Sequence, residues 1–257
     1  MIQLGNLEAN LARHCNLACT SCNHGSAVAT RWFMEPESMA RDLAHLSKAA
    51  HFHFHCLQGG EGTLNKKFLE FMDVQARSGI ADRYGMLTNG TLLDRMPEEF
   101  WLKAKQMDYE IRVSVYPALK KETLEYAQRK ANEYKLNFRA SNEFESFLKM
   151  FHANENKGQK VWEICPWKRC WTLHEGWFFN CPQAAFLPGQ FPELFPDITD
   201  PLVDGVRVEG ITEEKIRWMM EHEHPLESCA NCTGGTNVRI PWTQHRDRAE
   251  WIKASTV

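Results

Sequence analysis

The sequence predicts an α/β fold in which a curved, mostly parallel sheet carries helices on its outer face and a small cysteine-rich unit follows. Strand-like and helix-like segments alternate over residues 7–141, which is typical of parallel strands joined by right-handed crossovers. After residue 141 the alternation stops, and five of the nine cysteines fall within residues 165–232. We therefore expect one domain over residues 1–155 and a second, cysteine-rich domain over residues 156–257.

The first domain is expected to contain five strands and four helices. The strands are predicted at residues 7–13, 51–57, 83–88, 109–115 and 135–141, and the helices at residues 36–50, 66–78, 97–105 and 121–134. Pro36 suits the first position of a helix, where its missing N–H would have no partner. In the second domain the pattern predicts a polar linker over residues 154–160, a hairpin over residues 171–180, a proline-rich loop near residues 182–201 and a helix over residues 212–223.

Most of these strands have one apolar and one polar face. In the run HFHFHCL, Phe52, Phe54 and Cys56 alternate with His51, His53 and His55. A parallel sheet buried on both sides would have nearly continuous apolar strands, so we expect the polar face to line a wet, functional lumen. This places His55, together with Arg112 and Tyr116, among the expected substrate contacts. It places Cys56 against the helices as a buried structural thiol.

Composition excludes several classes of protein. The chain has 257 residues, a net charge of −3 and 43% hydrophobic residues, which suffices for a core. No long basic run exists, so we expect no nucleic-acid partner, and no apolar stretch approaches the roughly 18 residues of a membrane span. The N-terminus lacks the basic start and apolar segment of a signal peptide. We expect a cytoplasmic protein with reduced thiols that bind metal.

The first cysteine group has the spacing Cys15-x3-Cys19-x2-Cys22, directly after the first expected strand. Three thiolates on one loop suit three irons of a cubane and leave the fourth iron open. The second expected strand runs into Gly59, Gly60 and Glu61. The third ends in Leu-Thr-Asn-Gly, residues 87–90.

This combination resembles radical S-adenosylmethionine (radical SAM) enzymes. The resemblance implies a partial (β/α)6 TIM-like barrel in which Cys15, Cys19 and Cys22 hold a catalytic [4Fe-4S] cluster. It further implies SAM contacts from these residues: Gly59, Gly60, Glu61, Thr88, Asn89, Ser114 and Arg139. Two positions depart from the family pattern. Ser21 stands where an aromatic residue usually lies against adenine, and Gly62 stands where a proline usually follows the glycine motif.

The second cysteine group resembles the Twitch form of the SPASM/Twitch auxiliary domain. The spacing is Cys165-x10-Gly176-x4-Cys181, followed by Cys229-x2-Cys232. The resemblance implies a small C-terminal Twitch-type domain with one auxiliary [4Fe-4S] cluster, ligated by Cys181, Cys229 and Cys232. The fourth ligand is either Cys165 or Cys170, and the sequence leaves both open. A zinc site is the structural alternative.

The resemblance also implies a reaction. A 5′-deoxyadenosyl radical would abstract hydrogen from a small polar, sugar-like substrate, and the auxiliary cluster would accept an electron as the substrate is oxidised. The similarity is to carbohydrate- and aminocyclitol-modifying dehydrogenases and epimerases of natural-product biosynthesis, with flavodoxin or ferredoxin as the expected reductant. Alternatives are epimerisation, maturation of a peptide, and a zinc-binding interaction module without catalysis. Residues 234–257, which include Arg239, Trp242 and His245, match neither cysteine pattern.

Overall fold

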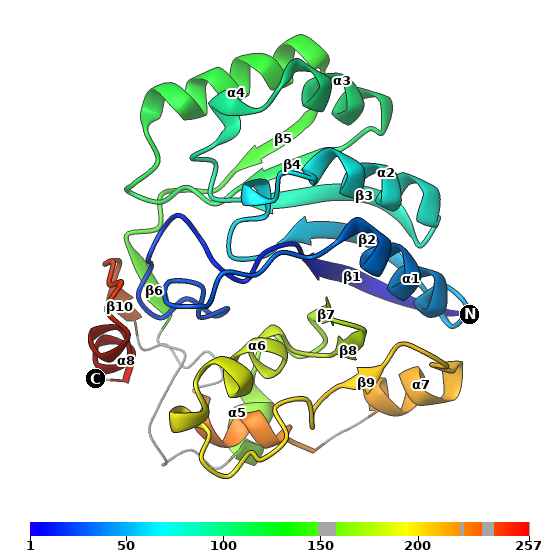
Figure 1. Ribbon diagram of the computed structural model, residues 1–257, viewed down its shortest axis with the longest axis vertical. Helices are drawn as coiled ribbons and strands as arrows, with labels where there is room; N and C mark the ends of the chain where they lie inside the picture. The colour runs from blue at the N-terminus through cyan, green and yellow to red at the C-terminus, as the bar shows by residue number, and fades with distance from the viewer. Residues whose placement is uncertain (149–157, 222–223, 233–238, 257) are drawn as a thin grey trace.

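The computed structural model describes residues 1–148, 158–221, 224–232 and 239–256. In this part of the chain the main sheet has the strand order β5-β4-β3-β2-β1-β7-β8-β9, and β6 and β10 form a separate pair (Figure 1). The strands of the main sheet are β1 (Ile2–Asn10), β2 (Ala50–Gln58), β3 (Ala81–Thr88), β4 (Glu110–Val113), β5 (Asn137–Ala140), β7 (Trp171–His174), β8 (Trp177–Phe179) and β9 (Val206–Arg207). Strands β1 to β5 are parallel in sequence order. The expected α/β class with a largely parallel sheet is confirmed.

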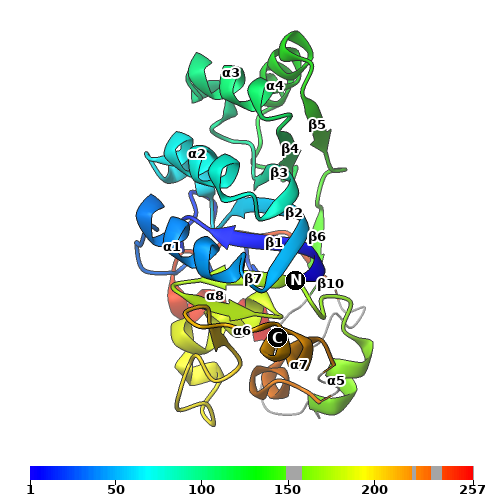
Figure 2. The ribbon, with the colours of Figure 1, turned by 90° about the vertical axis from the view of Figure 1, so that its right-hand side faces the viewer.

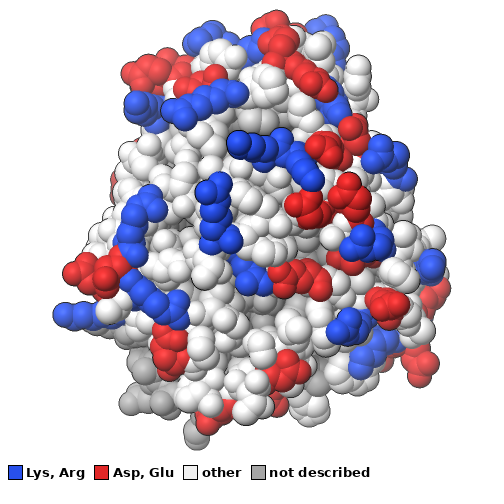
Figure 3. Space-filling view, viewed as in Figure 1, with Lys and Arg blue, Asp and Glu red and all other residues white. Residues whose placement is uncertain are grey.

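Four helices cover one face of the parallel strands, as Figure 2 shows. They are α1 (Pro36–Leu46), α2 (Phe68–Ser78), α3 (Glu98–Gln106) and α4 (Lys121–Tyr134). Pro36 occupies the start of α1 as expected, and α2 ends at Gly79, whose φ of 58° favours glycine. Their apolar side chains pack against Ala9, Leu57 and Ile111 of the sheet in one core. On the face in Figure 3, positive and negative side chains are interspersed.

The sheet continues beyond residue 155, because β7 pairs in parallel with β1 on the side away from β2. The registers Leu7↔Trp171 and Ala9↔Leu173 show this pairing. Strands β7 and β8 form the expected hairpin, and its turn residues Glu175 and Gly176 have φ values of 47° and 80°, the left-handed conformation that tight hairpins favour. The division into two domains at residue 155 stays a prediction.

The remaining helices come from the cysteine-rich part of the chain. They are α5 (Gly158–Ile164), α6 (Pro182–Gln190), α7 (Glu213–Glu221) and α8 (Arg248–Thr256). Helix α7 confirms the helix expected over residues 212–223, as far as residue 221. The expected proline-rich loop is wrong at its start, because α6 is helical there with Pro182 in its first turn. Of the expected linker, residues 154–157 lie outside the described residues, and residues 158–160 begin α5.

The two faces of β2 are the reverse of the expectation. Leu57 belongs to the core under the helices, and alternation places His55 on that same face. His55 is buried, its ring packs edge-on to Tyr84, and its backbone oxygen accepts a hydrogen bond from Gln75 of α2. His55 therefore does not face the lumen, and its proposed substrate contact is wrong.

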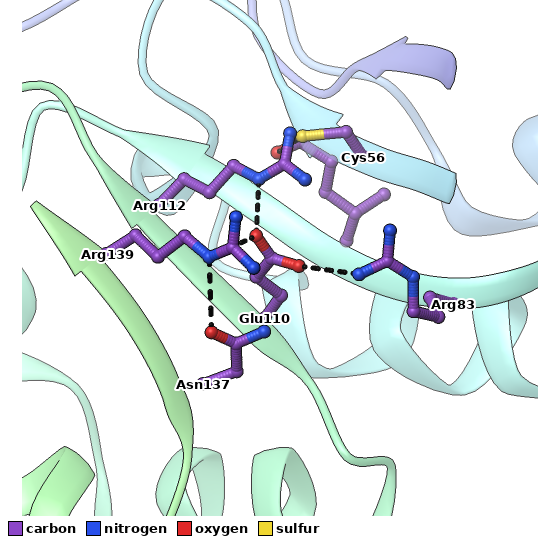
Figure 4. A network of polar contacts seen from close by, with 7 residues as sticks. Cys56, Arg83, Glu110, Arg112, Asn137 and Arg139 are labelled. Carbon is purple, nitrogen blue, oxygen red and sulfur yellow. Dashed lines mark hydrogen bonds and ion pairs between the residues drawn. The ribbon is translucent and has the colours of Figure 1, made fainter. Parts of the chain in front are cut away.

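Cys56 is correspondingly on the face opposite the helices, beside Arg112 (Figure 4). It is buried there, as expected, but not against the helices. The other two histidines of the run HFHFHCL contact a polar partner instead of a lumen. His51 and His53 bind Asp82 near the amino end of the sheet, and the His53 side chain is 66% exposed. Alternation separates two faces, but it does not identify the one that helices cover.

A second, two-stranded sheet joins β6 (Ser146–Leu148) and β10 (Arg239–Pro241) in antiparallel pairing. This pairing brings the C-terminal segment alongside the end of the parallel sheet (Figure 1). Among the described residues, no helix has both the length and the apolar character that a membrane span requires.

Candidate active site

A pocket of about 450 Å³ opens at the carboxyl ends of the parallel strands. Cys15, Cys19 and Cys22 line it together with Gly59, Gly60, Glu61, Thr88, Asn89, Ser114 and Tyr116. These residues come from the loop after β1 and from the carboxyl ends of β2, β3 and β4 or the residues that follow them. In parallel α/β sheets, ligands bind at this edge. The structure thus brings most of the expected SAM-site residues to one cavity.

The two glycines after β2 allow its end to lie against the backbone that leads into the cysteine loop. The N–H of Gly60 donates to the oxygen of Ala12 at 2.8 Å, and the N–H of Glu61 donates to the oxygen of His14 at 3.2 Å. A Cβ at Gly60 would lie 2.2 Å from the His14 oxygen, and one at Gly59 would lie 2.6 Å from the Ala12 oxygen. Any side chain at these two positions would therefore displace the cysteine loop.

Glu61 connects the ends of β2 and β3. Its buried carboxylate accepts hydrogen bonds from the Thr88 hydroxyl and the Asn89 N–H, both at 2.8 Å, and from the N–H and hydroxyl of Thr63. Such bonds fix both the position and the orientation of the carboxylate. Glu61 is thus a rigid negative group in the wall of the pocket.

Asn89 links this network to the first cysteine. Its side-chain amide donates to Cys15 Sγ at 3.4 Å and to the oxygen of the Asn16 side chain at 2.9 Å. Burial raises the pKa of Cys15, and the charge of Glu61 adds to the effect. Burial also raises the pKa of Cys19 to about 12, with a smaller contribution from Cys22. The thiols of Cys15 and Cys19 are thus protonated at neutral pH, and a metal bound to them would displace these protons.

The C-terminal segment holds the cysteine loop, a contact that the sequence did not reveal. The indole N–H of Trp242 donates to Cys19 Sγ at 3.2 Å, and that of Trp251 donates to the Cys19 backbone oxygen at 3.1 Å. The N–H of His245 donates to the oxygen of Ala18 at 2.9 Å. These contacts join positions more than 220 residues apart, and local sequence patterns carry no signal for them.

A second cavity, of about 20 Å³, lies in the cysteine-rich part of the chain. Four cysteines line it: Cys165, Cys181, Cys229 and Cys232. Val161, Trp162 and Leu226 supply apolar walls. Cys170 instead lines the first pocket.

The donors of both cysteine groups fit iron–sulfur clusters in type and in mutual proximity. Cys165, Cys181, Cys229 and Cys232 line one small cavity, and burial together with the other three thiols raises the pKa of Cys181. In the first group, Cys22 and Cys19 act on Cys15 in the same way. Among the described residues, no three His, Cys, Asp or Glu side chains form a site for a single metal ion.

Other expected residues differ in placement. Tyr116 lines the pocket, and its ring contacts Phe144 and Phe147, which line it as well. Arg112 and Arg139 do not line the pocket but form ion pairs with Glu110 on the open face of the sheet (Figure 4).

The pocket wall contains two further titratable groups that the sequence did not single out as a pair. Burial raises the pKa of Glu8 to about 7, against the lowering effects of Gln58 and Arg112. Burial also lowers the pKa of His24 to about 4, so its imidazole is neutral at pH 7. The pocket wall therefore carries a carboxyl group that can hold a proton near neutral pH and an uncharged histidine.

The parallel strands with helices on one face, the cysteine loop after β1 and the glycine turn after β2 form the arrangement that the sequence resemblance led us to expect. Comparison with solved structures bears on the fold. The crystal structure of BtrN in complex with AdoMet (S-adenosylmethionine) and 2-DOIA has a TM-score of 0.56 at 12% identity, and the match covers 92% of this chain and 98% of BtrN. At this identity the likeness establishes the fold.

Two other solved structures match over a smaller part of the chain. A histidine-tagged form of anSMEcpe with bound AdoMet is 22% identical with a TM-score of 0.44, and the match covers 54% of this chain and 43% of that one. SuiB of Streptococcus suis bound to precursor peptide SuiA is 16% identical with a TM-score of 0.32, covering 55% of this chain and 39% of SuiB. The matches thus span less than half the length of anSMEcpe and less than half the length of SuiB. No protein-family model and no curated protein matches the chain.

Proposed function

We propose that this chain is a radical SAM oxidoreductase that oxidises a small polar, sugar-like substrate. The proposal rests on one observation: Cys15, Cys19 and Cys22 line the same pocket as the Gly59–Gly60–Glu61 turn. A cysteine loop with this spacing at a structural zinc site would not require a buried carboxylate and a double glycine beside it. The fold shared with BtrN, which was solved with AdoMet, supports the same conclusion.

The three cysteines would hold a [4Fe-4S] cluster that, when bound, supplies the electron for reductive cleavage of SAM to a 5′-deoxyadenosyl radical. Glu61 and the backbone of Gly59 and Gly60 would bind the amino end of SAM in the pocket. Asn89 holds Cys15 in place through its amide. Tyr116, with its phenyl neighbours, would exclude water from the adenosyl side.

The second cysteine site would hold one auxiliary [4Fe-4S] cluster through Cys165, Cys181, Cys229 and Cys232, because these four cysteines line one cavity. Four thiolates would fill the ligand positions of a cubane. Such a cluster would serve as an electron acceptor rather than as a substrate site. BtrN was solved with 2-DOIA, and the polar groups of the present pocket suit a small hydroxylated molecule.

Epimerisation is the second candidate, and the position of Cys170 favours it. Cys170 lines the first pocket, so its thiol is available to a substrate radical. In that reaction the S–H bond of Cys170 would break as a C–H bond forms on the substrate. The resulting thiyl radical would take up one electron from a reductant protein and one proton from solvent.

The decisive experiment reconstitutes the protein anaerobically with iron and sulfide and measures bound iron together with 5′-deoxyadenosine after reduction with SAM. About eight irons per chain and formation of 5′-deoxyadenosine are expected. The Cys15→Ala variant should lose both the first cluster and the cleavage. Cys56→Ala is the matched control, because it removes a buried thiol outside both cysteine groups.

Retained cleavage in Cys15→Ala, or zinc without cleavage in the wild-type protein, would contradict the proposal. Solvent deuterium separates the two candidate outcomes. Oxidation gives a product that lacks two hydrogen atoms, whereas epimerisation gives a product of unchanged composition that carries deuterium from D2O.

A further inference from the structure

Three arginines surround one buried carboxylate on the face of the sheet opposite the helices (Figure 4). Arg83, Arg112 and Arg139 come from the adjacent strands β3, β4 and β5, and each forms an ion pair with Glu110. The nitrogen–oxygen distances are 3.3 Å from Arg83, 2.7 Å from Arg112 and 3.3 Å from Arg139. We call these four residues the arginine cluster.

The arginine cluster carries more positive than negative charge. One carboxylate faces three guanidinium groups, and no further ion pair of these arginines is found in the described part of the chain. The Glu110 side chain is only 2% exposed, whereas Arg83 and Arg139 are 56% and 62% exposed. Arg112 and Arg139 bind Glu110 through Nε, which leaves the two outer nitrogens of each guanidinium to donate elsewhere.

The cluster is also held in position. The Arg112 guanidinium carbon lies 4.1 Å from the centre of the Phe54 ring, and that of Arg83 lies 5.6 Å from it. Stacking of this kind reduces the freedom of a guanidinium group. The side-chain oxygen of Asn137 lies 3.3 Å from Arg139 Nε and accepts a hydrogen bond from it. Guanidinium groups fixed in this way are suited to an anion that binds two of them at once.

The cluster borders the candidate active site. Arg112 lies on β4 two residues before Ser114, which follows the end of that strand and lines the pocket. Leu87, which is paired with Arg112 across the strands, lines the pocket as well. Glu8 in the pocket wall is near enough for Arg112 to lower its pKa. A substrate in the pocket can therefore reach the arginine cluster along the sheet.

We propose that the arginine cluster binds a phosphate group of the substrate, so that the substrate is a phosphate monoester rather than a neutral sugar. This inference rests on the proposed function and assigns its substrate class. A phosphate monoester carries about −1.5 to −2 charges at pH 7, which matches the two positive charges that Glu110 does not balance. Arginine forks bind phosphate in a bidentate manner. Without such an anion, the three guanidinium groups share a single carboxylate and repel one another.

Phosphate binding is measured on the reconstituted protein with SAM bound, by calorimetric titration of inorganic phosphate at constant ionic strength in chloride. The Arg139→Gln and Arg112→Gln variants should each bind phosphate about tenfold more weakly, because each loses a charge-assisted hydrogen bond. Arg77→Gln, which removes an exposed arginine from α2 on the helix side, is the matched control and should bind as the wild type does. Arg139 is exposed enough that its variant folds even if Arg112→Gln does not.

A second readout separates this inference from the proposed function. The variants should still form 5′-deoxyadenosine from SAM in the absence of substrate, since none of the substituted residues lines the pocket. Wild-type protein that fails to bind phosphate, unchanged affinity in Arg139→Gln, or acetate binding as tight as phosphate would overturn the phosphate site while cleavage persists. Loss of cleavage in the wild-type protein with phosphate binding intact would instead overturn the proposed function.

Discussion

Serine substitution at Cys165 should remove the auxiliary cluster, whereas the same substitution at Cys170 should leave that cluster in place. The two positions are five residues apart, and the sequence alone does not choose between them. Cys165 shares its cavity with Cys181, Cys229 and Cys232. Cys170 faces the other pocket, where Glu8 raises its pKa in addition to the effect of burial.

The expected magnitude follows from the ligand count. A cubane bound by four thiolates holds four irons, so loss of one essential ligand should reduce the iron content from about eight to about four per chain. The cysteines of the first loop lie in the other pocket, so the Cys165→Ser variant should keep the first cluster. Its formation of 5′-deoxyadenosine without substrate should therefore continue, and oxidation of the substrate should fail.

The assay is the iron and sulfide content of both variants after identical anaerobic reconstitution, read beside their electron paramagnetic resonance spectra after reduction. Cys170→Ser serves as the control, because it removes a neighbouring thiol of similar burial. Wild-type iron content in Cys165→Ser together with half the iron in Cys170→Ser would refute the assignment. Half the iron in both variants would show that the segment, rather than one thiol, decides cluster binding.

Three further predictions concern the pocket. Gly60→Ala places a Cβ 2.2 Å from a backbone oxygen and should destabilise the fold by about 1–3 kcal/mol, as measured by denaturant unfolding. Gly5→Ala is the control and should not destabilise the fold, because a Cβ there meets nothing within 4 Å. Glu8 has a pKa raised from 4.5 to about 7, so the folded state favours its protonated form and the free energy of unfolding should fall as pH rises through this range. The Glu8→Gln variant should lack that fall. The same dependence of unfolding free energy on pH in the variant as in the wild type would contradict the prediction. Trp242→Phe removes the hydrogen bond to Cys19 and should lower the reduction potential of the first cluster, because bonds to cluster sulfurs stabilise the reduced state; a redox titration with an identical midpoint would count against this role.

Much of the fold could be predicted from the sequence because its signals are local. The alternation of apolar and polar residues located β2 and β3 within one or two residues at each end. The same signal failed for β1, which starts at Ile2 rather than at residue 7. Pairing between distant segments has no such signal. The place of β7 beside β1 depends on the contacts of the whole sheet.

The candidate site was predictable where a motif has fixed spacing and unpredictable where it depends on burial. The thiols of the first loop and the Gly59–Gly60 turn meet as expected. The error at His55 arose because a polar residue was assumed to face the lumen. Its ring is instead buried on the helix side, where low polarity lowers its pKa to about 3 and keeps it neutral. A neutral imidazole costs far less to bury than a charged one, so the sequence pattern could not reveal its side.

The two cysteine sites are neighbours because one short segment contributes to both. Trp167 lines the first pocket and also the second cavity, so one indole side chain forms part of the wall between them. Cys165 on one side of it belongs to the second cavity, and Cys170 on the other side belongs to the first. An electron leaving a substrate in the pocket would therefore have a short path to the auxiliary site. The same wall would keep a substrate radical from direct contact with the four thiolates, which favours electron transfer over ligation as the role of the second site.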